Sequence, residues 1–171
     1  MASELSSALA LDGSALAMYL QAHETGSHAG EGMAKRLLGR DDLDGDAKAF
    51  LRTFIVEVRV ERAHIVSLLD QIGRDESVMH RAVRAAGVAA EMAGRVGTVG
   101  SPKPFTDLEA LAIGVWGKRL LWGALIELSE VDERIASLPL RDLSDQAERQ
   151  EVVLLRLRSE SIRSSLTDRP S

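Results

Sequence analysis

Apolar residues recur at every third or fourth position through stretches of about 25 residues, and short breaker segments separate these stretches. This is the period of an α-helix, so we expect an all-α chain. The pattern predicts helices over about 14–38, 43–72, 106–128 and 143–166, an additional helix over about 76–96, and a breaker-rich loop at 97–104. A 25-residue helix is about 37 Å long, which favours a four-helix bundle. We expect one domain over 1–171, frayed at 1–12 and 167–171.

The composition restricts the chemistry that such a bundle can perform. The chain has no cysteine, which excludes disulfides, thiolate metal sites and thiol catalysis. Its 21 basic residues are dispersed among 26 acidic ones, so we expect no nucleic-acid partner. No apolar run reaches about 18 residues, so no membrane span is expected. The first residues do not resemble a signal peptide, and a cytoplasmic location follows as the expectation.

Charged residues lie on the apolar stripes of the predicted helices when each helix is projected at 100° per residue. In the helix over 43–72, Glu61 lies in the middle of the stripe, and Glu57 and His64 flank it. Glu61 and His64 therefore form a Glu-x-x-His pair with two potential ligands on adjacent turns. The apolar members of this stripe are Ala47, Phe54, Val58, Ile65, Leu68 and Ile72.

The helices over 14–38 and 143–166 repeat the pattern. In the first, His23 lies within the stripe and Glu31 beside it, and the glycines of this helix are expected to permit close helix crossing (Gly26, Gly30 and Gly32). In the second, Glu151 and Arg158 fall within a stripe formed by apolar residues, with Glu148 at its edge (Ala147, Leu154, Leu155 and Ile162).

The helix over 106–128 is apolar nearly all round, so we expect it to be the most enclosed. Glu109 projects to the side that carries Ala112, Trp116 and Leu120, whereas Lys118 and Arg119 project elsewhere. Burying unpaired carboxylates is costly, so those on the stripes must be matched by metal ions, by basic side chains or by protons.

These residues resemble the ferritin-like superfamily, whose di-iron and di-manganese members take one Glu from each of two helices and Glu-x-x-His from each of the other two. The resemblance implies metal ligation by Glu31 on the first helix, by Glu61 and His64 on the second, and by Glu109 on the third. The last helix departs from the pattern, because Glu148 and Glu151 stand where many members have an imidazole. His23 is a further candidate ligand.

The stretch from Met18 to Leu38, followed later by LEALAIGVWGKRLLW, also looks like a group of short bacterial ferritin-like helical proteins. The superfamily has one long crossover, which the segment 76–96 would supply, making the second and third bundle helices parallel. The resemblance further implies two Fe or Mn ions, with Glu61 and Glu151 as bridging ligands. Such a centre would oxidise Fe²⁺ or an organic substrate with oxygen or peroxide.

The alternative is a metal-free ferritin-like bundle with a buried ion network. In it, Arg62, Arg119, Arg158 and His23 would neutralise the carboxylates on the stripes (Glu31, Glu61, Glu109 and Glu151). The chain would then be a scaffold or a partner-binding protein that associates with itself, with Trp116 and Trp122 either in the core or at the interface. The sequence leaves both hypotheses open, and with them the question of whether the chain is an enzyme.

Overall fold

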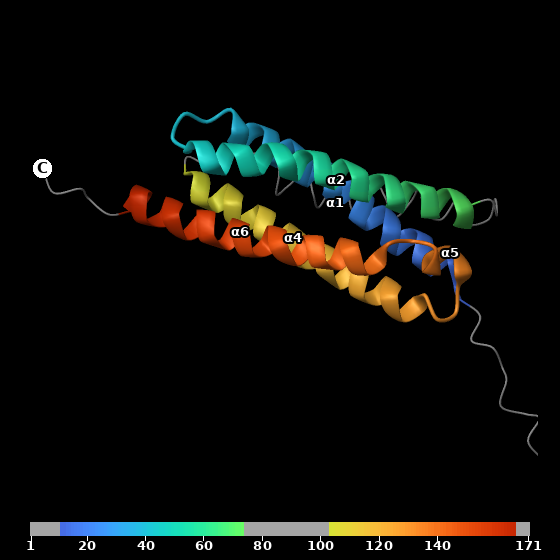
Figure 1. Ribbon diagram of the computed structural model, residues 1–171. Helices are drawn as coiled ribbons and strands as arrows, with labels where there is room; N and C mark the ends of the chain where they lie inside the picture. Colours follow the sequence, from blue (N-terminus) through green and yellow to red (C-terminus); the bar gives the residue numbers. More distant parts are fainter. Residues whose placement is uncertain (1–10, 74–102, 167–171) are drawn as a thin grey trace, which may run out of the picture.

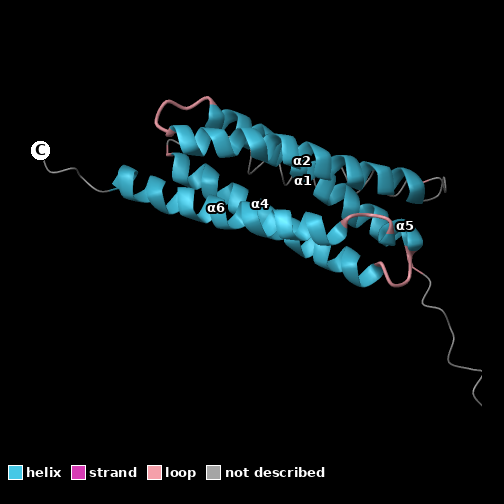
Figure 2. Ribbon diagram, viewed as in Figure 1, coloured by secondary structure: helices cyan, strands magenta, loops and turns pink. Residues whose placement is uncertain are grey.

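The computed structural model describes residues 11–73 and 103–166, and the elements in these two ranges are helices joined by short loops (Figure 2). They are α1 (Gly13–Leu38), α2 (Gly45–Ile72), α4 (Pro104–Leu128), the short α5 (Glu133–Ala136) and α6 (Leu140–Leu166). The all-α class is therefore confirmed over the described ranges. The expected helix over 76–96, most of the loop at 97–104 and most of both ends lie outside them.

The ends of the helices follow local capping chemistry. The side chain of Asp12 accepts hydrogen bonds from the backbone N–H groups of Ser14 and Ala15, which begins α1. The side chain of Asp44 accepts from the N–H of Ala47 in the same way and begins α2. Helix α4 begins at Pro104, earlier than expected, because proline is well suited to a first helical position where no N–H is needed.

The four long helices lie side by side in two antiparallel pairs (Figure 1). A short loop joins α1 to α2, and α5 lies in the connection between α4 and α6. The pair formed by α4 and α6 packs most extensively, and α1 contacts α4 across the bundle. Helices α2 and α4 run in the same direction (Figure 1). None of the described helices is both long and apolar enough to cross a membrane.

In α2, α4 and α6, most buried positions form a seam with alternating steps of four and three residues, the repeat of a left-handed bundle. In α2 this seam comprises Ala47, Leu51, Phe54, Val58, Glu61, Ile65, Leu68 and Ile72. In α6 it comprises Leu140, Leu143, Ala147, Gln150, Leu154, Leu157 and Ser161. In α4 the buried residues Leu108, Leu111, Val115, Trp122 and Leu125 follow the same steps, with Lys118 at the position between Val115 and Trp122. Each of these three seams therefore carries a polar residue near its middle.

Candidate functional site

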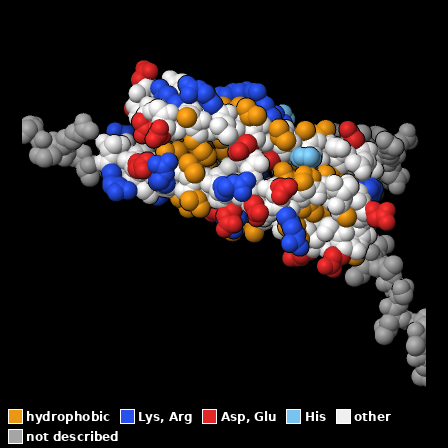
Figure 3. All heavy atoms as spheres, in the orientation of Figure 1, with side chains coloured by type: hydrophobic (Ala, Val, Ile, Leu, Met, Phe, Trp, Pro, Cys, Tyr) orange, Lys and Arg blue, Asp and Glu red, His pale blue; other side chains and the backbone are white. Residues whose placement is uncertain are grey.

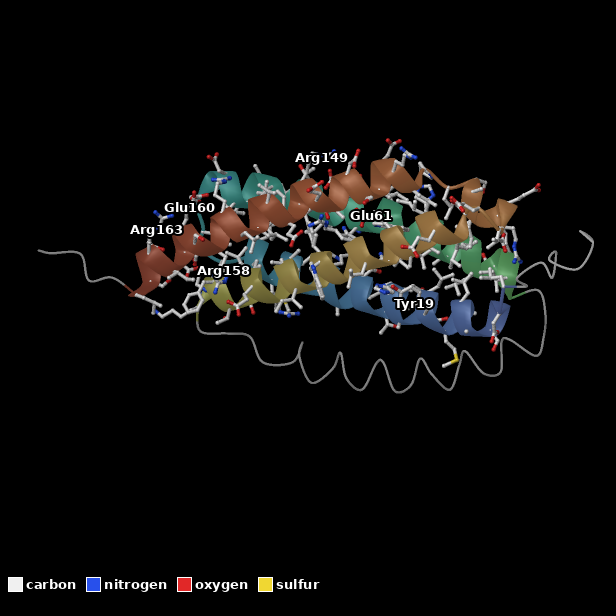
Figure 4. The ribbon with its side chains drawn as sticks, turned by 90° about the horizontal axis from the view of Figure 1, so that it is seen from below. Tyr19, Glu61, Arg149, Arg158, Glu160 and Arg163 are labelled. Carbon is white, nitrogen blue, oxygen red and sulfur yellow. The ribbon has the colours of Figure 1, made fainter. Side chains whose placement is uncertain are left out.

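The three central polar residues meet inside the bundle. The ammonium Nζ of Lys118 donates a hydrogen bond to Oε2 of Glu61 at 2.6 Å and another to Oε1 of Gln150. The side chain of Gln146 donates to Oε1 of Glu61 at 2.9 Å, and Gln150 donates to Oε2 of Glu57 at 2.7 Å. In Figure 4, Glu61 lies among the helices, whereas Arg149 projects away from α6. We call the five residues joined by these hydrogen bonds the polar layer (Glu57, Glu61, Lys118, Gln146 and Gln150).

The Glu61–Lys118 pair in the polar layer is almost removed from solvent. Glu61 is 2% exposed and the side chain of Lys118 is 14% exposed. Burial raises the pKa of Glu61 and lowers the pKa of Lys118, and the attraction between the two groups opposes both shifts. The ammonium also lies 5.7 Å from the centroid of the Phe54 ring. Each buried charge therefore depends on the other for its stability.

A second cluster forms around Glu31 on α1. Its carboxylate lies 2.7 Å from the nearest nitrogen of each of three cations, Lys35, Arg59 and Arg62. Hydrogen bonds from these cations hold the pKa of Glu31 well below its usual range. Three cations around one carboxylate leave the cluster with a surplus of positive charge.

The remaining candidate carboxylates pair with arginines between α4 and α6. Glu109 lies 2.6 Å from Arg158, and Arg119 lies 3.7 Å from Glu148 and also bonds Glu151. These are pairs in which the side chains keep substantial contact with solvent, so each contributes little to stability. The space-filling view of the α2 and α6 face shows the same alternation of acidic and basic side chains around small hydrophobic patches (Figure 3).

The two histidines that the sequence singled out have different surroundings. His23 packs edge-on against Tyr19, with the ring centroids 4.8 Å apart, and burial lowers its pKa. His64 is half-buried on α2, three residues after Glu61. Of the basic residues expected to neutralise carboxylates, Arg62, Arg119 and Arg158 do contact them, but the cation that contacts Glu61 is Lys118.

These contacts bear on the metal centre that the ferritin-like resemblance implies. The candidate ligands Glu31, Glu61, Glu109 and Glu151 each bind a cationic side chain, at separate places in the bundle. Over 11–73 and 103–166, no three side chains of His, Asp or Glu come together in a group that could hold a metal ion. The donor set in this arrangement does not fit a di-metal centre, and the centre stays a prediction.

One side of α4 is exposed, although the whole helix was expected to be enclosed. Ile113, Trp116 and Leu120 are each more than half exposed, whereas Trp122 is fully buried and Lys118 reaches the interior. A helix that is apolar nearly all round shows almost no difference between its faces, so projection could not identify the buried one. Exposed apolar side chains are common where proteins associate, but nothing here tests the expected self-association, which stays a prediction.

The expected stripe of α6 is rotated from the buried seam. Leu155 is exposed and Glu151 lies at the edge of the seam, whereas Gln150 is buried. The places of Gln146, Gln150 and Lys118 in the polar layer were therefore not predicted from the sequence. Gln150 could have been found from its spacing, because it lies three residues after Ala147 and four residues before Leu154, as a buried position of a bundle does.

A cavity of about 460 Å³ lies between α1, α2 and α4. Its walls are mostly apolar, with Phe54, Val58 and Ile65 contributed by α2. Polar side chains also line it, namely His23, Glu61, Arg62 and Lys118. A cavity of this size with a few polar groups among apolar ones has the character of a small-molecule site.

Glycines on α1 and α4 widen this cavity. A Cβ atom added at Gly26, Gly114 or Gly117 would meet no other atom of residues 11–73 and 103–166 within 4 Å. The expectation that the glycines of α1 permit close helix crossing is therefore wrong for Gly26. It is also wrong for Gly32, whose Cβ would have as its nearest neighbour Arg36 of the same helix. Gly30 comes nearest to a crossing contact, since its Cβ would lie 4.0 Å from Leu111 of α4.

No family model, curated protein or solved structure matches this chain. The candidate site is therefore assigned from the geometry and chemistry of its own residues.

Proposed function

We propose that this chain binds a small, largely apolar molecule in the cavity between α1, α2 and α4. The observation that carries the proposal is the cavity itself, about 460 Å³ in volume and bordered by glycines where a side chain would fit. The cavity opens to solvent beside the exposed Gly26 and Gly114, so its apolar walls are in contact with water. A ligand with an apolar body would remove these walls from water, which is favourable.

The ion pairs support a binding role that needs no metal. Glu61 is neutralised by Lys118, and Glu31 by three cations, so the carboxylates nearest the cavity already have counter-ions. The polar layer anchors α2, α4 and α6 to one another at the level where the cavity is lined by Glu61 and Lys118. Directional hydrogen bonds of this kind support a preformed site.

The test fills the cavity and measures binding of a neutral fluorescent probe, N-phenyl-1-naphthylamine. We expect the probe to bind the wild-type chain with increased fluorescence, and Gly114→Leu to abolish the increase because the new side chain occupies the cavity. Gly123→Leu is the matched control, since Gly123 lies on the same helix, has open space around it and does not line the cavity. Both substitutions favour the helix by up to about 1 kcal/mol, so helix loss would not explain a difference.

Two results would contradict the proposal. One is the absence of probe binding to the wild-type chain at concentrations where its helical content is intact. The other is equal loss of binding in the two leucine variants, which would place the probe outside the cavity.

A further inference from the structure

The proposed function leaves open what kind of apolar molecule the cavity takes, and the charged side chains on its wall narrow the choice. Arg62 and Lys118 both line the cavity, one from α2 and one from α4. The guanidinium of Arg62 is bonded to the carboxylate of Glu31, and the ammonium of Lys118 to that of Glu61. The cavity therefore has two cationic groups on its wall, beside apolar surfaces that would hold the rest of a ligand.

Arg62 has an unused hydrogen-bond donor. Its Nη2 binds Oε2 of Glu31 at 2.7 Å, but its Nη1 is buried and has no hydrogen-bond partner among the residues that the structure describes. Buried donors in folded proteins are nearly always satisfied by protein, water or ligand, so an orphaned guanidinium nitrogen beside a cavity indicates a missing acceptor. Since Glu31 is shared with Lys35 and Arg59, the charge of Arg62 is only partly balanced.

Lys118 also has donor capacity to spare. An ammonium group carries three N–H donors. Two are directed to Glu61 and Gln150, and the other contact recorded for the ammonium in the described part of the chain is with the face of the Phe54 ring. A ligand oxygen could accept a hydrogen bond from the third N–H without displacing Glu61 or Gln150.

Glu61 is poorly placed to select a cationic ligand instead. Its two oxygens already accept hydrogen bonds from Lys118, Gln146 and Gln150. Binding an ammonium ligand would bring it close to the cations Lys118 and Arg62, which like charge disfavours. An anionic ligand can therefore accept hydrogen bonds from Arg62 and Lys118. An amine ligand would have to compete for the oxygens of Glu61, which already accept hydrogen bonds.

We propose that the ligand is a medium-chain carboxylic acid whose carboxylate accepts hydrogen bonds from Arg62 and Lys118 and whose alkyl chain fills the space beside Gly26, Gly114 and Gly117. This inference rests on the proposed function, because it names the ligand class of the same cavity. A carboxylate offers two oxygens, which suits two separate donors.

The experiment compares two ligands that differ only at the headgroup, decanoate and decanol, by isothermal titration calorimetry. We expect the wild-type chain to bind decanoate about tenfold more tightly than decanol, the size of effect that a charge-assisted hydrogen bond supplies. Arg62→Gln should weaken decanoate binding much more than decanol binding, and so remove most of this preference. The variant keeps Glu31 paired with Lys35 and Arg59, and retained decanol binding shows that the cavity has survived.

Arg59→Gln is the matched control. Arg59 also binds Glu31, but its side chain is half exposed and it does not line the cavity, so the preference for decanoate should persist. Equal binding of decanoate and decanol by the wild-type chain would overturn the headgroup assignment while leaving the proposed apolar site in place. Loss of the preference in both arginine variants would also overturn it. Failure of N-phenyl-1-naphthylamine and of both decyl ligands to bind would overturn the proposed function itself.

Discussion

Glu61 is the residue at which the chemistry of the polar layer can be tested most directly, because its carboxylate is almost fully enclosed and contacts the ammonium of Lys118. Glu61→Gln leaves the ammonium of Lys118 without its counter-ion, and Lys118→Met leaves the carboxylate of Glu61 without its counter-ion. We expect each change to lower the free energy of unfolding by about 3 kcal/mol. The double variant should cost less than the sum of the two, by about 2 kcal/mol. Urea denaturation of the four proteins measures this coupling, and strictly additive costs would show that the pair contributes no interaction energy.

Glu31 should control the response to acid. Its pKa in the folded chain is lowered below the unfolded value by three cations, so its contribution to stability is present above the unfolded pKa of about 4.3 and is lost as the pH falls through the folded pKa. We expect Glu31→Gln to lower the free energy of unfolding at pH 7 by about 1 to 2 kcal/mol, mostly through Arg62, since Lys35 and Arg59 are half exposed. Denaturation curves at several pH values should show this difference shrinking below about pH 4. A difference that is constant from pH 7 to pH 3 would contradict the ion-pair explanation.

At the scale of single helices, the sequence is informative where polar and apolar residues alternate and uninformative where they do not. The apolar stripe of α2 was predicted correctly, including the buried place of Glu61. Helix α4 is apolar on nearly every side, so neither the exposure of Trp116 nor the enclosure of Lys118 could be predicted from its periodicity. For α6, the sequence was projected at 3.6 residues per turn, whereas buried positions in a bundle repeat every 3.5 residues. The two differ by about 20° per heptad, which is enough to place Glu151, and not Gln150, on the predicted buried side.

Contacts between helices depend on which helices are neighbours, and periodicity carries no such information. Glu61 and Lys118 are 57 residues apart in the chain, and each could have been matched to several opposite charges. The cavity is also a property of the assembled helices. The glycines of α1 predicted a close crossing, yet the space beside Gly26 stays open because α4 also presents Gly114 and Gly117 to the same cavity.

At the scale of the whole molecule, the metal hypothesis and the ion-pair arrangement predict different behaviour. If the carboxylates keep their cationic partners, added Mn²⁺ should leave the free energy of unfolding unchanged, and elemental analysis of chain purified without an affinity tag or chelator should find no stoichiometric Fe or Mn. A site that binds only the folded chain would instead raise that free energy by about 2.7 kcal/mol at a Mn²⁺ concentration one hundred times its Kd. Glu109→Gln separates the two hypotheses without disturbing the core, because the Glu109–Arg158 pair keeps substantial contact with solvent. Two ions per chain in the wild type, lost in this variant, would establish that the carboxylates exchange their arginine and lysine partners for metal.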